Sequence, residues 1–186
     1  NVVVVPTCID TDRFAPVTDR PARAWVTIGW SGSPSTIEHL RTLLPVLERV
    51  KRVYGERVRL RVMGDPAFAH PPSDIQGERW SPEAELALLR DMDIGVMPLP
   101  DNEWTRGKCG FKALLYMACG VPPVCSPVGM TTDIVQDGQN GLLASTTEEW
   151  IEKLSLLVEN PTLRRQMGEA GRTTVEEKYS LTTHAP

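Results

Sequence analysis

Cysteine and histidine are scarce in this sequence, and neither is grouped. The chain of 186 residues has four cysteines and three histidines. The cysteines, Cys8, Cys109, Cys119 and Cys125, show no CxxC spacing, so the sequence predicts neither a disulfide framework nor a zinc site. We therefore expect a reducing, cytoplasmic location, no metal and no other cofactor.

The charge and apolar patterns exclude two further classes of function. The net charge is -4, and no basic stripe is present to neutralise a phosphate backbone, which argues against nucleic-acid binding. No apolar run approaches the roughly 18 residues that a membrane-spanning helix needs. The chain also lacks a starting Met and begins inside an apolar strand at residues 2–5, so we expect it to be an excised piece of a longer protein.

What the sequence does contain is an alternation of strands and helices. The hydrophobic fraction of 41% is ordinary for a soluble globular chain. Strands are expected at 24–30, 58–63, 93–99, 121–125 and 142–144, with helices at 36–54, 83–92, 111–119, 130–137 and 148–159 and a last helix from 160 towards 179. This order predicts an α/β, Rossmann-like fold, with a parallel sheet covered by helices on both faces.

Punctuating residues refine this outline. Pro45 predicts a kink or break in the first long helix, and Ser81 with Pro82 predicts the start of the helix at 83–92. We expect that helix to bury Leu86, Leu89 and Met92, and residues 65–76 to form a surface loop. The domain is expected to cover residues 24–180, with an edge strand and linker at 1–23 and a tail without pattern at 181–186.

The stretch from Arg106 to Gly129 is the most informative part of the chain. It reads as a loop, a short apolar helix, a Gly stop and a buried strand. Lys108 and Lys112 flank the free N–H groups of the helix start, which favours an anion site for a phosphate. A capped core helix whose lysines only meet water is an equally good interpretation.

Two other loops carry weaker signals. The small-residue loop Ser31-Gly32-Ser33 joins a strand to a helix, as in a mononucleotide-binding unit, but such loops are also plain tight turns. Arg79 and Trp80 lie between a strand and a helix. Trp80 is either a stacking surface for a flat base or a staple onto the following helix.

Four segments together resemble the C-terminal half of a retaining glycosyltransferase of the group 1 family, which has two Rossmann-like domains in a GT-B fold. They read IGWSGSPST, DIGVMPLP, LLYMACGVPPVCSPVG and IVQDGQNGLLA. The resemblance implies a nucleotide-sugar binding domain of an enzyme that transfers a hexosyl group from a nucleoside diphosphate sugar. A missing N-terminal domain would bind the acceptor, so this piece alone would be inactive. Peripheral membrane contact would come only through that absent half.

The resemblance also implies roles for individual residues. The diphosphate would lie near the Ser31 to Ser33 loop and Lys108, the base near Arg79 and Trp80, and the donor sugar near the next helix start. The implied donor-binding residues are Ser31, Gly32, Ser33, Arg79, Trp80, Lys108, Cys109, Gly110, Phe111, Lys112 and Leu115.

The chain departs from the family pattern at several positions. Many members carry two glutamates eight positions apart, and here these positions are Gly107 and Leu115, whose side chains cannot accept a hydrogen bond from a hydroxyl. Trp30 stands where an Arg is general, and the loop has gained Lys108 and Lys112. We interpret this as a divergent branch with rearranged donor contacts. A non-catalytic nucleotide-sugar binding module and a sugar-nucleotide epimerase of the same architecture are the alternatives.

Overall fold

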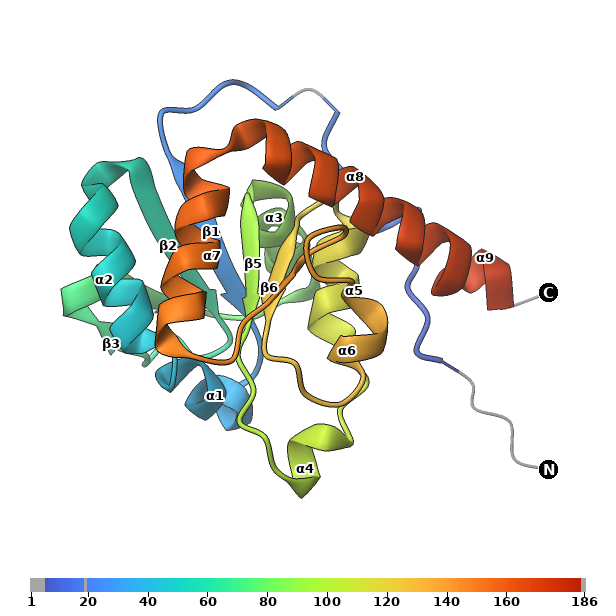
Figure 1. Ribbon diagram of the computed structural model, residues 1–186, viewed down its shortest axis with the longest axis horizontal. Coiled ribbons are helices and arrows are strands. Elements are labelled where there is room, and N and C mark those ends of the chain that lie inside the picture. Colours follow the sequence, from blue (N-terminus) through green and yellow to red (C-terminus); the bar gives the residue numbers. More distant parts are fainter. Residues whose placement is uncertain (1–5, 19, 185–186) are drawn as a thin grey trace.

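The computed structural model describes residues 6–18 and 20–184 and arranges them around a seven-stranded sheet in the order β3-β4-β2-β1-β5-β6-β7 (Figure 1). Every pair is parallel except β3 with β4. The predicted Rossmann-like fold is confirmed, while the expected strand at 2–5 lies outside the described residues. The strands are β1 Val26–Ser31, β2 Val58–Met63, β3 Ala69–His70, β4 Ile75–Glu78, β5 Ile94–Met97, β6 Pro123–Cys125 and β7 Leu142–Leu143.

The helices follow the predicted alternation. Pro45 breaks the first long helix, as expected, and occupies the second position of α2, where its missing N–H costs no helical hydrogen bond. The helices are α1 Ile37–Arg41, α2 Leu44–Tyr54, α3 Pro82–Asp91, α4 Glu103–Arg106, α5 Phe111–Ala118, α6 Thr131–Ile134, α7 Thr147–Glu159, α8 Pro161–Lys178 and α9 Leu181–His184.

Each face of the sheet has its own apolar core. Helices α1, α2 and α7 supply one core, with side chains such as Leu40, Leu47 and Leu154 against β1 and β2. Helices α3 and α5 supply the other, and α8 packs along α5 (Figure 1). Because both faces of the sheet are covered, the central strand β1 is buried along its whole length.

Residues 65–76, expected to be a surface loop, instead form a short hairpin. Ala69 pairs with Gln76, and His70 pairs with Ile75. Two prolines between these strands fix a tight 3-10 turn over residues 71–73. The buried side chains of Phe68 and Ile75 anchor the hairpin to the core beneath α1, α2 and α7. The prolines indicated a turn correctly but hid the strands on either side of it.

Two smaller expectations were also wrong. Leu86 is only half-buried, and the buried stripe of α3 consists of Leu88 and Leu89, continued by Met92 after the helix. The tail, expected to have no pattern, begins with the one-turn helix α9. It is held because the Leu181 N–H donates to the Ile9 carbonyl at 3.0 Å, while the Ile9 N–H donates to the Tyr179 carbonyl at 2.7 Å.

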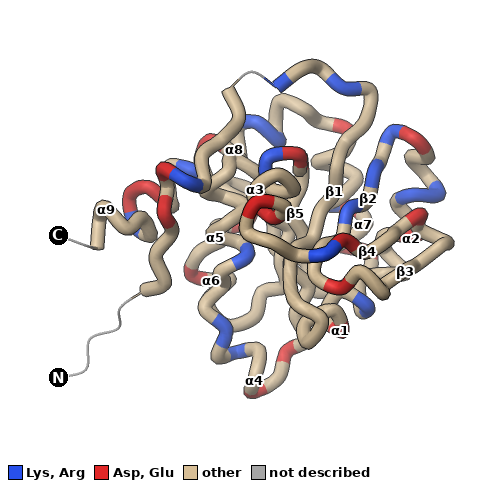
Figure 2. Tube along the Cα trace, turned by 180° about the vertical axis from the view of Figure 1, so that it is seen from behind, with Lys and Arg blue, Asp and Glu red and all other residues tan. Residues whose placement is uncertain are grey.

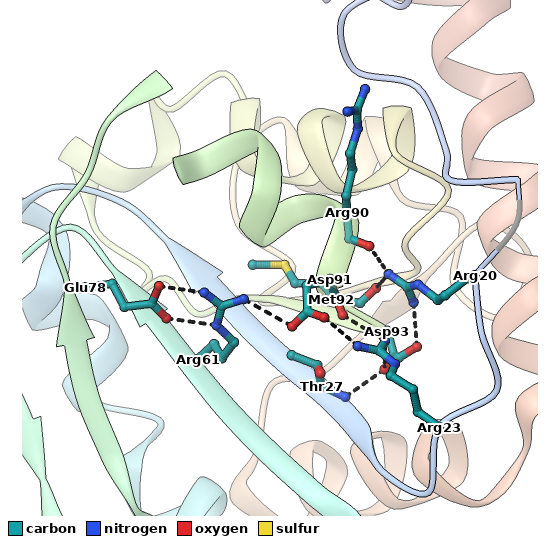
Figure 3. A network of polar contacts seen from close by, with 9 residues as sticks. All are labelled: Arg20, Arg23, Thr27, Arg61, Glu78, Arg90, Asp91, Met92 and Asp93. Carbon is teal, nitrogen blue, oxygen red and sulfur yellow. Dashed lines mark hydrogen bonds and ion pairs between the residues drawn. The ribbon is translucent and has the colours of Figure 1, made fainter. Parts of the chain in front are cut away.

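The segment before β1 is fixed to the domain by a chain of ion pairs (Figure 3). Asp93 accepts from Arg20 at 2.7 Å, from Arg23 at 3.0 Å and from the Thr27 N–H at 2.7 Å. Arg23 also donates to Asp91 at 2.5 Å, and Asp91 accepts from Arg61 of β2 at 3.1 Å. Residues 20–23 are therefore tied to the edge of the sheet where β1 and β5 begin.

Candidate functional site

The candidate site lies at the carboxyl edge of the sheet, where β1 and β5 end and α5 begins. In parallel α/β sheets this edge forms the crevice that receives ligands. Gly110 precedes α5 with φ +69°, and a Cβ on it would lie 2.5 Å from Ile134 Cδ1. Glycine is therefore required at this turn, which aims the start of α5 into the crevice.

The main-chain N–H groups differ between the two predicted phosphate loops. The Gly32 N–H donates to the Met63 carbonyl at 3.0 Å, and the Ser33 N–H donates to Thr36 Oγ1 at 3.0 Å. By contrast, the N–H groups of Cys109 and Gly110 have no acceptor within the part of the chain that the structure describes. The start of α5, rather than the loop after β1, thus has donors to offer to a ligand.

Lys112 is the most unusual side chain of the site. Its Nζ lies 5.5 Å from the centroid of the Trp30 ring, and it has no hydrogen bond or ion pair with residues 6–18 or 20–184. Burial lowers its pKa, the charge of Lys108 lowers it further, and Glu85 and Cys109 oppose the shift. A largely desolvated ammonium without a protein partner is costly, and an anionic ligand would offset that cost.

Lys108 is half-buried and lies beside an exposed aromatic ring. Its Nζ lies 5.8 Å from the ring centroid of Trp104, and Trp104 is 78% exposed on α4. Helix α4 projects from the body of the molecule beside the start of α5 (Figure 1). Lys108 can therefore move towards a ligand at the expense of one weak cation–π contact.

Ser31 is held by neighbours that sequence patterns did not reveal. Its side chain is 2% exposed, and its Oγ donates to Glu85 Oε1 at 2.5 Å. The Ser31 N–H contacts the Tyr116 hydroxyl at 3.4 Å, and that hydroxyl donates to the Val96 carbonyl at 3.2 Å. Glu85 is separated from Ser31 by 54 positions, so no local spacing could have paired them.

His39 is another residue of the site that the sequence left unassigned. Burial lowers its pKa first, followed by the charges of Lys108 and Lys112. The imidazole of His39, on α1, therefore lies near the ammonium groups of Lys108 and Lys112. Its lowered pKa makes the imidazole neutral near pH 7.

The remaining predicted residues are spread around the crevice. Phe111 is exposed, Leu115 is a core residue with 2% exposure, and Gly107 is exposed at the end of α4. Arg79 and Trp80 are exposed after β4, and neither forms a hydrogen bond or ion pair in the described structure. The structure thus brings Lys108 and Lys112 near each other, while Arg79 and Trp80 follow β4, two strands along the sheet from β1.

The described residues contain neither a metal-binding cluster nor a membrane-spanning helix. In residues 6–18 and 20–184, no three His, Cys, Asp or Glu side chains lie close enough together to hold a metal ion. Over the same ranges, no helix combines the length and apolarity needed to cross a bilayer.

Comparison with known proteins decides the family. The model of the family described as "Glycosyl transferases group 1" matches residues 26–160. The chain belongs to this family. A solved structure of the C-terminal domain of a glycosyl transferase group 1 family protein from Francisella tularensis covers 93% of the chain with a TM-score of 0.70 at 19% identity, and the match takes in 99% of that domain.

Other similar proteins extend the comparison. A D-inositol 3-phosphate glycosyltransferase from Arthrobacter sp. is 32% identical over 111 residues, which are 58% of this chain and 23% of that relative. One from Corynebacterium jeikeium is 25% identical over 89% of this chain and 45% of its own length. The solved Anabaena Alr3699/HepE in complex with UDP and glucose has a TM-score of 0.73 at 13% identity, covering 95% of this chain and 52% of that one. The chain therefore spans less than half the length of the two D-inositol 3-phosphate glycosyltransferases.

Proposed function

We propose that this chain is the donor-binding domain of a retaining glycosyltransferase that transfers a hexosyl group from a nucleoside diphosphate sugar to an acceptor. The observation that carries the proposal is the Lys112 ammonium, desolvated and without a partner in the described structure, beside the free N–H groups at the start of α5. A diphosphate is the group that such a cation and such donors recognise together.

Charge explains how this geometry would assist the reaction. When the bond between sugar and diphosphate breaks, negative charge grows on the leaving phosphate. Lys112, Lys108 and the N–H groups of Cys109 and Gly110 would stabilise that charge more in the transition state than in the ground state. Two lysines supply positive charge at the leaving group, so we propose that the donor binds without a metal ion.

A structurally similar protein supports the proposed binding of a nucleotide sugar. Alr3699/HepE is solved with UDP and with UDP-glucose, so UDP is the first nucleoside diphosphate to test for binding to this chain. We propose that the base stacks near Trp80, that the acceptor binds to a part of the protein outside this chain, and that this chain alone is inactive. A cytoplasmic location, with any membrane contact made by that other part, completes the proposal.

Calorimetric titration of the chain with UDP, GDP and ADP, each paired with its nucleoside, tests the donor site. Lys112→Met and Lys108→Ala are expected to weaken diphosphate binding about tenfold or more, because each removes a charge-assisted hydrogen bond. Nucleoside binding should not change. Lys178→Met, at an exposed end of α8, is the matched control. Equal losses for the diphosphate and the nucleoside would refute a phosphate role for the substituted lysine.

His39 favours a second candidate. Because it lies near Lys108 and Lys112 with a lowered pKa, it could act as a general base in a sugar-nucleotide epimerase of the same architecture. Assays of the full-length protein separate the possibilities. Sugar transfer supports the glycosyltransferase, an epimerised donor without acceptor supports the epimerase, and intact donor binding with neither product supports a non-catalytic module.

A further inference from the structure

A cavity lies at the opposite edge of the sheet, away from the start of α5. Its volume is about 880 Å³, the size of a small-molecule site. The segment before β1, the end of α3, the turn between α5 and β6, and α8 form its walls. At its inner end the backbones of α8 and the turn touch, because a Cβ on Gly168 would lie 2.0 Å from the Gly120 carbonyl oxygen.

Arginine dominates the polar lining of this cavity. Figure 2 shows basic segments of α8, of the end of α3 and of the coil before β1 gathered at this end of the molecule. The only carboxylates in the lining are those of Asp93 and Glu169, both within the described residues. The arginines are Arg20, Arg90, Arg164, Arg165 and Arg172.

Three of these arginines donate hydrogen bonds to the carbonyl groups at the ends of helices, which explains why they are present. Helices α3, α5 and α7 end at this edge, and their last carbonyl groups lack helical donors. Arg20 donates to the Met92 carbonyl at 2.8 Å, Arg172 to the Ala118 carbonyl at 2.7 Å and Arg164 to the Val158 carbonyl at 3.1 Å. These bonds fix the three guanidinium groups without using all five N–H donors of each.

Arg90 and Arg165 have no such task. Within the described structure Arg165 has no hydrogen bond or ion pair, and Arg90 makes one long contact of 3.5 Å to the Arg13 carbonyl. Arg90 from the end of α3 and Arg172 from α8 both line the cavity, as does the buried Cys119. Burial and the charge of Arg20 lower the pKa of Arg164, against the attraction of Asp93. The positive charge of the cavity is therefore incompletely compensated by the described residues.

We propose that this cavity is a second binding site, for a small phosphate ester held by Arg90 and Arg165 against the fixed guanidinium groups of Arg164 and Arg20. Guanidinium groups bind phosphate in bidentate fashion, and the two guanidinium groups that are already fixed, those of Arg20 and Arg164, lose little entropy on binding. The lining also contains apolar side chains, including Val17, Met92, Val121 and Pro122. An ester with an apolar group therefore fits better than the free ion. The site does not depend on the proposed donor site, which lies at the other edge.

Calorimetric titration with phenyl phosphate and with inorganic phosphate tests the proposal. We expect phenyl phosphate to bind more tightly than inorganic phosphate. Arg165→Glu and Arg90→Glu should each weaken its binding about tenfold or more, through loss of a charge-assisted contact. Both positions are exposed and cap no helix, so these variants should fold. Arg49→Glu, exposed on α2, is the control for net charge, and Lys112→Met excludes binding at the start of α5.

The outcomes divide clearly. Weakening by Arg165→Glu and Arg90→Glu, with Arg49→Glu and Lys112→Met unchanged, supports the site. Equal weakening by Arg49→Glu would reduce the effect to net charge and overturn the proposal. Loss of phenyl phosphate binding in Lys112→Met would mean that the ester binds at the donor site, which would also overturn the proposal. Tighter binding of inorganic phosphate than of phenyl phosphate would contradict the ester, and no binding of either would refute the site.

Discussion

Replacing Lys112 by Met should make the ligand-free protein more stable. The substitution keeps a long unbranched side chain against Trp30 but removes an ammonium that no described residue pairs. Burying an unpaired ion costs several kcal/mol in effective terms, and the cation–π contact returns about 1–2 kcal/mol. Since Lys112 is still partly open to solvent, we discount the difference to a net gain of about 1 kcal/mol, or roughly 2–4 °C in Tm for a chain of this size.

Lys51 provides the matched comparison, because it is a buried lysine with partners. Its side chain is 14% exposed, and its Nζ donates to the Val58 carbonyl at 3.1 Å and lies 3.6 Å from Glu56. Lys51→Met should therefore destabilise the chain by about 1.5 kcal/mol, the loss of a charged hydrogen bond. Denaturant unfolding of both variants measures whether each substitution raises or lowers the free energy of unfolding. A Lys112→Met variant that loses as much stability as Lys51→Met would refute the unpaired state of Lys112.

The gain should also depend on pH. Burial lowers the folded-state pKa of Lys112 below its ordinary value of 10.5. Between the folded pKa and 10.5 the unfolded chain binds more protons, so the wild-type protein gains stability there as pH rises. The advantage of Lys112→Met should shrink across that window, and an advantage that stays constant to pH 10.5 would contradict the assignment.

Three further predictions about the scaffold are tested by denaturant unfolding. Asp93→Asn should cost about 3 kcal/mol because it leaves two partly buried guanidinium groups short of a negative partner. Asp101→Asn, in an exposed pair, should cost much less; similar losses for the two variants would refute the difference. Gly129→Ala places a Cβ 2.5 Å from the backbone oxygen of Arg106. It should cost more stability than Gly138→Ala, because Gly138 also has a left-handed φ but has open space around it. Equal costs would mean that the backbone around Gly129 relaxes. Thr146→Ala removes the cap of α7 and should cost about 1 kcal/mol, and no change would show that water replaces the cap.

Sequence patterns predicted most of the fold because the relevant signals are local. The break before Pro45, the cap at Ser81 and the left-handed Gly120 each follow from the backbone preferences of one or two residues. The hairpin at 69–76 escaped prediction because its strands are two and four residues long, too short for a period to show. Its stability comes from buried Phe68 and from pairing rather than from propensity.

The site was predicted less completely, for a different reason. Lys108 and Lys112 were recognised because a helix start is visible in the sequence. Their environment is set by residues from other elements, namely Trp30, Glu85 and His39, which only the folded sheet brings near. The arginine-lined cavity likewise joins the coil before β1 to α8, which are more than 130 residues apart in places.

A structure of the chain with the nucleoside diphosphate that binds most tightly would test the central claim most directly. We predict a phosphate oxygen within hydrogen-bond distance of Lys112 Nζ and of the N–H groups of Cys109 or Gly110. A diphosphate bound elsewhere, with Lys112 still unpaired against Trp30, would contradict the assignment of the start of α5 as the donor site.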